Sequence, residues 1–197
     1  MALLRLNGEG RLCLRSATGT KDVTETPVMK DVLLLIDTSG SMAGAKITQA
    51  KHGAADFSRT ASLQGRATAL AVFGDRAEVV CNPTIEAVAF QKKIGGLTVG
   101  MVGGSTNLAA GLELAASFAN LGAVVVVTDG EPDSPNAALE SAARLKQKSV
   151  EILCIGTEDA DGLFLAKLAT RKELSLHVAA QNLRASIAQA SQLLLGK

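Results

Sequence analysis

Residues 31–42 constrain the fold of this chain more than any other stretch. Residues 32–36 are uniformly apolar and are followed at once by a carboxylate, Asp37, and then by two hydroxyls, Ser39 and Ser41. An unbroken apolar run of this length predicts a strand that is buried on both faces of a parallel sheet. Asp37 then lies at the carboxyl end of that strand, on the edge where open α/β sheets bind their ligands.

Two further loops carry oxygen donors in a similar position. Residues 95–107 are rich in glycine, contain Thr106 and precede a predicted helix, and the apolar run 123–127 is followed by Thr128 and Asp129. Carboxylate and hydroxyl oxygens are hard ligands, which suit Mg²⁺ or Mn²⁺ far better than a soft metal. The three loops together predict one divalent-metal site at the edge of the sheet.

Strands alternate with helices along the rest of the chain. Helical periodicity follows residue 44 and recurs after most of the later apolar runs, which is typical of an α/β fold. We expect a doubly wound, Rossmann-like and mostly parallel sheet of about six strands, with helices on both faces. Residues 77–81 follow a tight turn at 74–76 and are therefore expected to form one antiparallel edge strand.

The first 30 residues differ from the remainder. Residues 3–16 alternate between leucine and arginine around a glycine-containing turn, which predicts an N-terminal hairpin, and residues 17–30 form a polar connection. We therefore divide the chain into an N-terminal hairpin and connecting segment, 1–30, and an α/β domain, 31–197.

Composition excludes several classes of partner. The formal charge is +1 and there is no Trp or Tyr, so neither a nucleic-acid nor a membrane surface is indicated. Three cysteines without CxxC spacing predict neither a disulfide framework nor a zinc site. Because the N-terminus lacks the pattern of a signal peptide, we expect a cytoplasmic protein.

The three loops resemble the metal-ion-dependent adhesion site of the von Willebrand factor A family. The matching segments are Asp-Thr-Ser-Gly-Ser at 37–41, Gly-Gly-Ser-Thr-Asn at 103–107 and Thr-Asp-Gly at 128–130, in the order that the family uses. The resemblance implies a complete site in which Ser39 and Ser41 coordinate the metal directly and Thr106 joins or leaves the coordination shell. It further implies that Asp37 and Asp129 hold the metal directly or through water.

The resemblance also implies a binding function. Mg²⁺ keeps several waters when few protein ligands reach it, which leaves a coordination position for an incoming carboxylate. We therefore expect a protein-recognition module that binds an Asp or Glu side chain of a partner and is not an enzyme. Given the expected cytoplasmic location, the chain resembles the intracellular branch of the family more than its extracellular members. We therefore expect the partner to be an ATPase or another subunit of a complex.

Other readings of the same residues stay open at this point. A metal-dependent phosphoester hydrolase would use Asp37 or Asp129, although neither His52 nor His177 is placed as an obvious general base. A structural module whose site is never metallated is the other alternative, with the hairpin making the contact. Two of the apolar residues near the site, Leu97 and Val99, could equally pack beneath the second loop. The residues that could rim the site as an apolar contact surface are Met42, Ala43, Leu97, Val99, Met101 and Val102.

Overall fold

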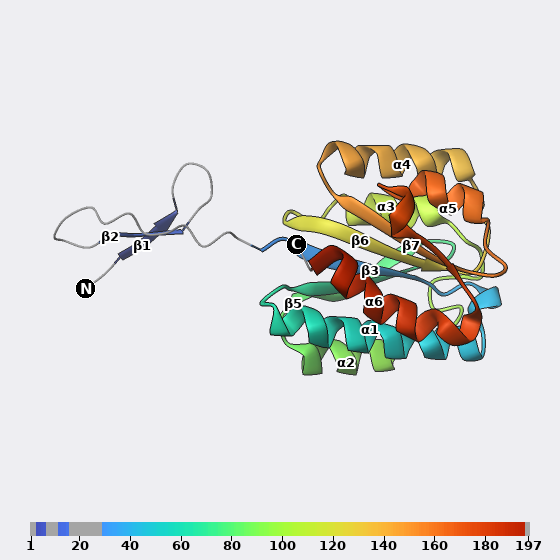
Figure 1. Cartoon of the computed structure of the whole chain (residues 1–197), viewed down its shortest axis with the longest axis horizontal. Coiled ribbons are helices and arrows are strands. Elements are labelled where there is room, and N and C mark those ends of the chain that lie inside the picture. Colours follow the sequence, from blue (N-terminus) through green and yellow to red (C-terminus); the bar gives the residue numbers. More distant parts are fainter. Residues whose placement is uncertain (1–2, 7–11, 16–28, 196–197) are drawn as a thin grey trace.

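The computed structural model describes residues 3–6, 12–15 and 29–195. In this part of the chain the main sheet has six strands in the order β5-β4-β3-β6-β7-β8 (Figure 1). The strands are β3 (Asp31–Asp37), β4 (Thr68–Phe73), β5 (Ala77–Thr84), β6 (Leu121–Thr128), β7 (Glu151–Thr157) and β8 (Ser175–Val178). Neighbouring strands are parallel except that β5 runs antiparallel to β4 at the edge. The predicted fold class is confirmed.

Helices cover both faces of this sheet (Figure 1). One face carries α1 (Ala45–Leu63), α2 (Ala87–Gly95) and α6 (Leu183–Leu195), and the other carries α3 (Leu108–Ala115), α4 (Pro135–Gln147) and α5 (Gly162–Leu168). Short 3₁₀ turns lie at Gly40–Met42 (η1), Lys172–Leu174 (η2) and Ala180–Asn182 (η3).

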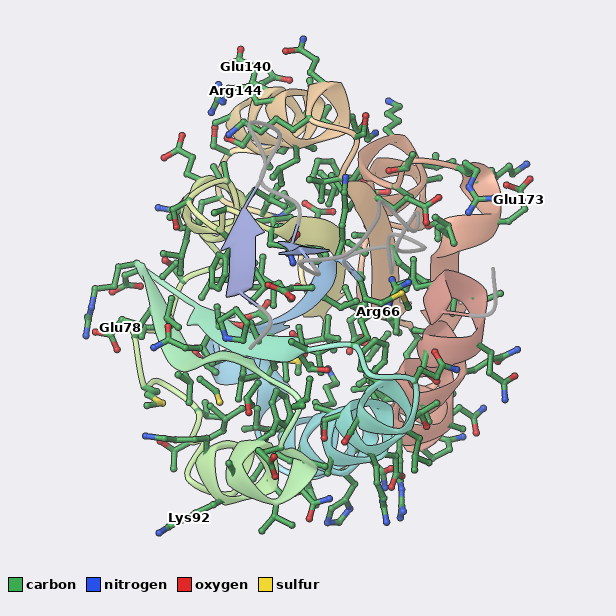
Figure 2. All side chains as sticks on the ribbon, turned by 90° about the vertical axis from the view of Figure 1, so that its left-hand side faces the viewer. Arg66, Glu78, Lys92, Glu140, Arg144 and Glu173 are labelled. Atoms are coloured by element: carbon green, nitrogen blue, oxygen red, sulfur yellow. The ribbon has the colours of Figure 1, made fainter. Side chains whose placement is uncertain are left out.

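The central strands are buried on both faces, as their unbroken apolar runs predict. The apolar side chains of β3 are fully buried, and those of β6 and β7 nearly so. Charged side chains such as Glu78, Lys92 and Glu140 point away from the body instead (Figure 2). The core is mostly aliphatic, with Phe57, Phe73 and Phe90 as its largest fully buried side chains. Truncating one of its leucines to alanine is expected to cost about 2–5 kcal/mol of stability.

A close helix contact fixes α1 against α6. A Cβ at Gly53 of α1 would lie 2.8 Å from the Cβ of Ile187 and 2.9 Å from the carbonyl oxygen of Arg184, both on α6. Any larger side chain at position 53 would push the two helices apart. α6 therefore fixes the position of α1, the helix that follows the first of the three loops.

The predicted N-terminal hairpin has two paired strands. β1 (Leu3–Leu6) and β2 (Leu12–Arg15) are antiparallel, with Leu3 opposite Arg15, and they form a sheet of their own. Residues 17–28 of the predicted polar connection lie outside the described residues, and the domain boundary at residue 30 stays a prediction. Over the described ranges, no helix has the length and apolar character needed to cross a membrane.

Candidate metal centre

The site begins where β3 and β6 end side by side. These parallel neighbours pair through Ile36 and Val127, so the residues after them emerge at the same edge of the sheet. Asp37 is the last residue of β3 and Thr128 the last of β6. The Thr128 hydroxyl donates a hydrogen bond of 2.6 Å to Asp37 Oδ2, which joins two loops that lie 91 residues apart in the sequence.

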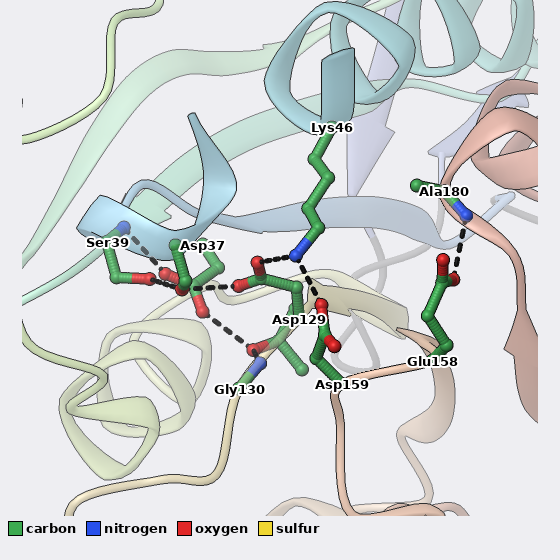
Figure 3. A network of polar contacts seen from close by, with 10 residues as sticks. Asp37, Ser39, Lys46, Asp129, Gly130, Glu158, Asp159 and Ala180 are labelled. Carbon is green, nitrogen blue, oxygen red and sulfur yellow. Dashed lines mark hydrogen bonds and ion pairs between the residues drawn. The ribbon is translucent and has the colours of Figure 1, made fainter. Parts of the chain in front are cut away.

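The predicted ligands of the first and third loops form one polar cluster (Figure 3). The backbone N–H of Ser39 donates to Asp37 Oδ1 over 2.8 Å, and the hydroxyl oxygens of Ser39 and Ser41 lie 3.1 Å apart. Ser41 donates to Asp129 Oδ1 over 2.7 Å. Asp37, Ser39 and Asp129 are almost fully buried, whereas Ser41 is exposed, so the cluster opens to solvent beside Ser41.

Thr106 of the second loop faces the same space. A Cβ placed on Gly130 would lie 3.7 Å from the Thr106 hydroxyl oxygen and 4.0 Å from that of Ser41. The two hydroxyls therefore border a common point, and the absence of a side chain at Gly130 leaves room there. All five residues that the sequence predicted as ligands lie around this cluster.

The second loop is held in place by its neighbours. Asp75, in the turn between β4 and β5, accepts a hydrogen bond of 2.8 Å from the Ser105 N–H, and this bond is the main reason that the pKa of Asp75 is lowered. Gly103 has φ +105°, and a Cβ there would collide with the Asp75 side chain. A glycine is therefore required at position 103 on both counts.

Asp133 ties the second loop to the third. Its carboxylate accepts from the Thr106 N–H over 3.1 Å, and its own N–H donates to the Thr106 carbonyl over 3.1 Å. Through these two hydrogen bonds Asp133 positions Thr106. A contact between two separate loops, such as this one, cannot be predicted from the local sequence.

Burial dominates the electrostatics of Asp37. Desolvation raises the pKa of this carboxyl, while the hydrogen bonds from Thr128 and Ser39 act in the opposite direction without cancelling it. The nearby Asp129 carboxylate raises it further. Two carboxylates in one buried cluster therefore favour a cation as a third component.

Lys46 is a member of the cluster that the sequence did not single out. Its ammonium donates to Asp129 Oδ2 over 2.6 Å and to Asp159 Oδ2 over 2.7 Å (Figure 3). Burial on its own would lower the pKa of Lys46, but the two carboxylates outweigh it and the pKa is raised. Lys46 lies in the first turn of α1, so the first loop delivers both hydroxyl donors and a positive charge.

The donor set fits a hard divalent cation. No group of three or more His, Cys, Asp or Glu side chains able to hold a metal occurs among the described residues, so any metal here must use hydroxyl oxygens as well. Such oxygens are present: Ser39, Ser41 and Thr106 lie beside the carboxylates of Asp37 and Asp129. This all-oxygen set suits Mg²⁺ or Mn²⁺.

The apolar rim of the site is smaller than the sequence suggested. Met42, Leu97 and Val102 are buried and belong to the core, so the apolar rim is reduced to exposed Ala43 and Met101 and half-buried Val99. Ser134, the N-cap residue of α4 after the third loop, makes no capping hydrogen bond through its side chain.

Neither Ser41 nor Thr106 is the N-cap residue of the α-helix that follows it. The N-cap of α3 is Asn107, which accepts from the Ala110 N–H, and not Thr106. Ser41 lies within η1, the short turn before α1, and its hydroxyl is directed to Asp129.

Comparison with known proteins gives a family match and a set of similar folds. A family model described as the von Willebrand factor type A domain matches residues 32–131. No curated protein sequence matches the chain. The matched range begins within β3 and ends just after Asp129, so it contains all three loops of the cluster.

Solved structures with the same fold come from distant organisms. The von Willebrand factor domain of the pili tip protein Mfa5 from Porphyromonas gingivalis is 15% identical with a TM-score of 0.73, covering 85% of this chain and 96% of that one. The manganese-loaded TRAP protein of Plasmodium vivax is 21% identical with a TM-score of 0.66, covering 83% and 73%.

A third similar structure is the proximal thread matrix protein 1 from the mussel byssus, described with a zinc-occupied MIDAS motif. It is 17% identical with a TM-score of 0.64, covering 83% of this chain and 46% of that one. The chain thus spans less than half the length of this mussel protein. At these identities the comparisons show a common fold.

Proposed function

Because the chain belongs to the von Willebrand factor type A family, we propose that it is a protein-recognition module that binds an acidic side chain of a partner through a divalent cation. The cation would be Mg²⁺ or Mn²⁺. The observation that carries this proposal is the hydroxyl and carboxylate cluster at the ends of β3 and β6, which opens to solvent at Ser41.

The residues of the cluster have separate tasks in this proposal. Ser39, Ser41 and Thr106 supply neutral oxygens, and Asp37 and Asp129 supply two negative charges that balance a divalent cation. A bound cation would provide an electrophilic point for the oxygen of an incoming carboxylate. The two carboxylates only neutralise the cation, so the site has no net negative charge that would repel a partner's Asp or Glu. The cation then attracts that carboxylate.

Support for metal binding also comes from the similar structures. One is described as manganese-loaded and another as having a zinc-occupied MIDAS motif. We infer the same type of site here from the donor set, since Ser39, Ser41, Thr106, Asp37 and Asp129 lie together in one cluster.

We favour a binding role over catalysis because, in the part of the chain that the structure describes, the hydrogen bonds of the cluster involve no histidine that could act as a general base. His52 and His177 are both exposed, and a ring nitrogen of His177 lies 3.2 Å from the Ala160 carbonyl oxygen. The cytoplasmic location and the identity of the partner, an ATPase or another complex subunit, remain predictions of this proposal.

The test is calorimetric titration of Mg²⁺ and Mn²⁺ into the wild-type chain and Asp37→Ala, combined with partner capture from lysate with and without chelator. We expect metal binding in the wild type, its loss in Asp37→Ala, and release of the captured partner by the chelator. Glu140→Gln, which neutralises an exposed carboxylate on α4, is the matched control and is expected to behave as wild type.

Each alternative gives a distinct result. Turnover of a phosphoester with Mg²⁺ or Mn²⁺ that disappears in Asp37→Ala would replace the recognition role by a hydrolase. Absence of metal binding, with partner capture lost only on deletion of residues 1–27, would favour a structural module that binds through its hairpin.

A further inference from the structure

The position of Lys46 is not explained by helix stability. It lies in the first turn of α1, where the aligned backbone dipoles make the helix end positive and disfavour a cation. Its side chain is 18% exposed, so the ammonium is also partly removed from water. Both effects work against a lysine here, and the two carboxylates that it contacts must offset them.

Those two carboxylates are in different surroundings. Asp129 has a side chain with no exposed surface and accepts from Ser41 through its other oxygen, whereas the Asp159 side chain is 64% exposed on the loop after β7. Lys46 is therefore the counter-ion of the buried Asp129 carboxylate, and its ammonium also pairs with the exposed carboxylate of Asp159. An unpaired Asp129 at this depth would destabilise the fold.

Resting on the function proposed above, we propose that Lys46 is an intramolecular competitor of the metal that sets the cation concentration at which the site is filled. Its ammonium neutralises Asp129 when no cation is bound. A divalent cation that shares this carboxylate is repelled by the ammonium, which lowers its affinity. Asp159 adjusts the competition, because it draws the ammonium away from Asp129.

This arrangement has two consequences. The metal-free chain keeps its buried carboxylate paired and stays folded, so metal binding is not a condition of folding. The site also responds to the level of free cation rather than holding one permanently, which makes recognition of an acidic partner adjustable.

The test is a calorimetric titration of Mn²⁺ alone into the wild type, Lys46→Met and Lys46→Arg. Because a nearby positive charge is removed, Lys46→Met is expected to bind Mn²⁺ roughly tenfold more tightly. Lys46→Arg keeps the charge and is expected to stay close to wild type. Lys92→Met, which removes an exposed charge from α2, is the control and should not change the affinity.

A second readout covers the folding of the variants. Without metal, Lys46→Met is expected to have a lower Tm than the wild type, and saturating Mn²⁺ should raise its Tm by more than it raises that of the wild type. Asp159→Asn, at an exposed position, is expected to weaken Mn²⁺ binding several-fold. The same change made in the Lys46→Met background should have little effect, because Asp159 acts through the ammonium.

The outcomes separate this proposal from the function on which it rests. Equal or weaker Mn²⁺ binding by Lys46→Met, with binding still lost in Asp37→Ala, would overturn the role of Lys46 and leave the metal site standing. Binding by Lys46→Met when the wild type binds none would support it. Absence of binding in every variant would overturn both proposals.

Discussion

Strand β3 begins and ends with an aspartate, and its two ends differ instructively. Asp31 accepts from the side chain of Asn120, which precedes β6, and Asp37 accepts from Thr128, the last residue of β6. Burial raises the pKa of both carboxyls. At each end of β3 the aspartate thus accepts from a polar residue that lies in β6 or directly before it.

The surroundings make only one of these ends a candidate site. Asp31 is half-buried beside an exposed amide, whereas Asp37 is fully buried and adjoins the hydroxyls of Ser39 and Ser41. A carboxylate at a strand end is therefore not enough. Convergent hydroxyls and a second buried carboxylate distinguish the carboxyl-terminal edge.

The sharpest comparison is neutralisation of each aspartate in turn. We expect Asp37→Asn to weaken Mn²⁺ binding by more than about 100-fold, because it removes a charge from the cluster itself. This is more than the loss of a residue that only hydrogen-bonds to a metal ligand would cause. Asp31→Asn is expected to leave the affinity unchanged. Calorimetry on both variants checks this, and an equal loss in the two would show that the ends do not differ in function.

A smaller effect is expected from the polar partners of the two carboxylates. Thr128→Val removes a buried donor to Asp37 and should lower metal affinity about 10–100-fold and stability by about 1–3 kcal/mol. Asn120→Ala removes the exposed counterpart at Asp31 and should change neither metal affinity nor, beyond about 1 kcal/mol, stability. Mn²⁺ titration and urea unfolding measure both quantities. Unchanged metal affinity in Thr128→Val would mean that Thr128 does not position Asp37.

The smallest effect concerns the pH dependence of the metal-free chain. Since burial raises the pKa of Asp37, the folded state binds its proton more tightly than the unfolded state does. Stability therefore falls as the pH rises from the ordinary carboxyl pKa, about 4, through the raised value. Asp37→Asn should remove this decline, so that in chelator its free energy of unfolding exceeds that of wild type near neutral pH.

Asp31→Asn tests the same relation at the other end. The pKa of Asp31 is also raised, but this carboxyl is half-exposed, so the gain in stability near neutral pH should be smaller than for Asp37→Asn. Urea unfolding of both variants across the acid range provides the comparison. The same pH slope in Asp37→Asn and wild type would contradict the expected cost of burying Asp37.

Much of the fold could be predicted because its signals are local. The apolar runs of β3, β6 and β7 are long enough to indicate buried parallel strands, and the turn at 74–76 correctly indicated the antiparallel edge. The first-loop serines and the aspartates at the strand ends lie within a few residues of those runs. Their meeting at one edge follows from parallel pairing.

The connections between loops could not be predicted in the same way. Lys46 reaches Asp129 and Asp159 across 83 and 113 residues of sequence, and Asp133 reaches Thr106 across 27. Such pairs depend on side-chain reach and on the exact path of three loops. A lysine at the start of a helix, where the dipole disfavours it, is the signal that could have indicated Lys46.

The hydrogen bond between Thr128 and Asp37 also has a consequence for the order of events during synthesis. Because its two residues lie 91 positions apart, no nascent chain that stops before β6 can assemble the cluster. Pairing β3 with β6 closes a long loop, which is a slow step in folding. If the cluster binds a partner as proposed, a growing chain gains that ability only after β6 has been made.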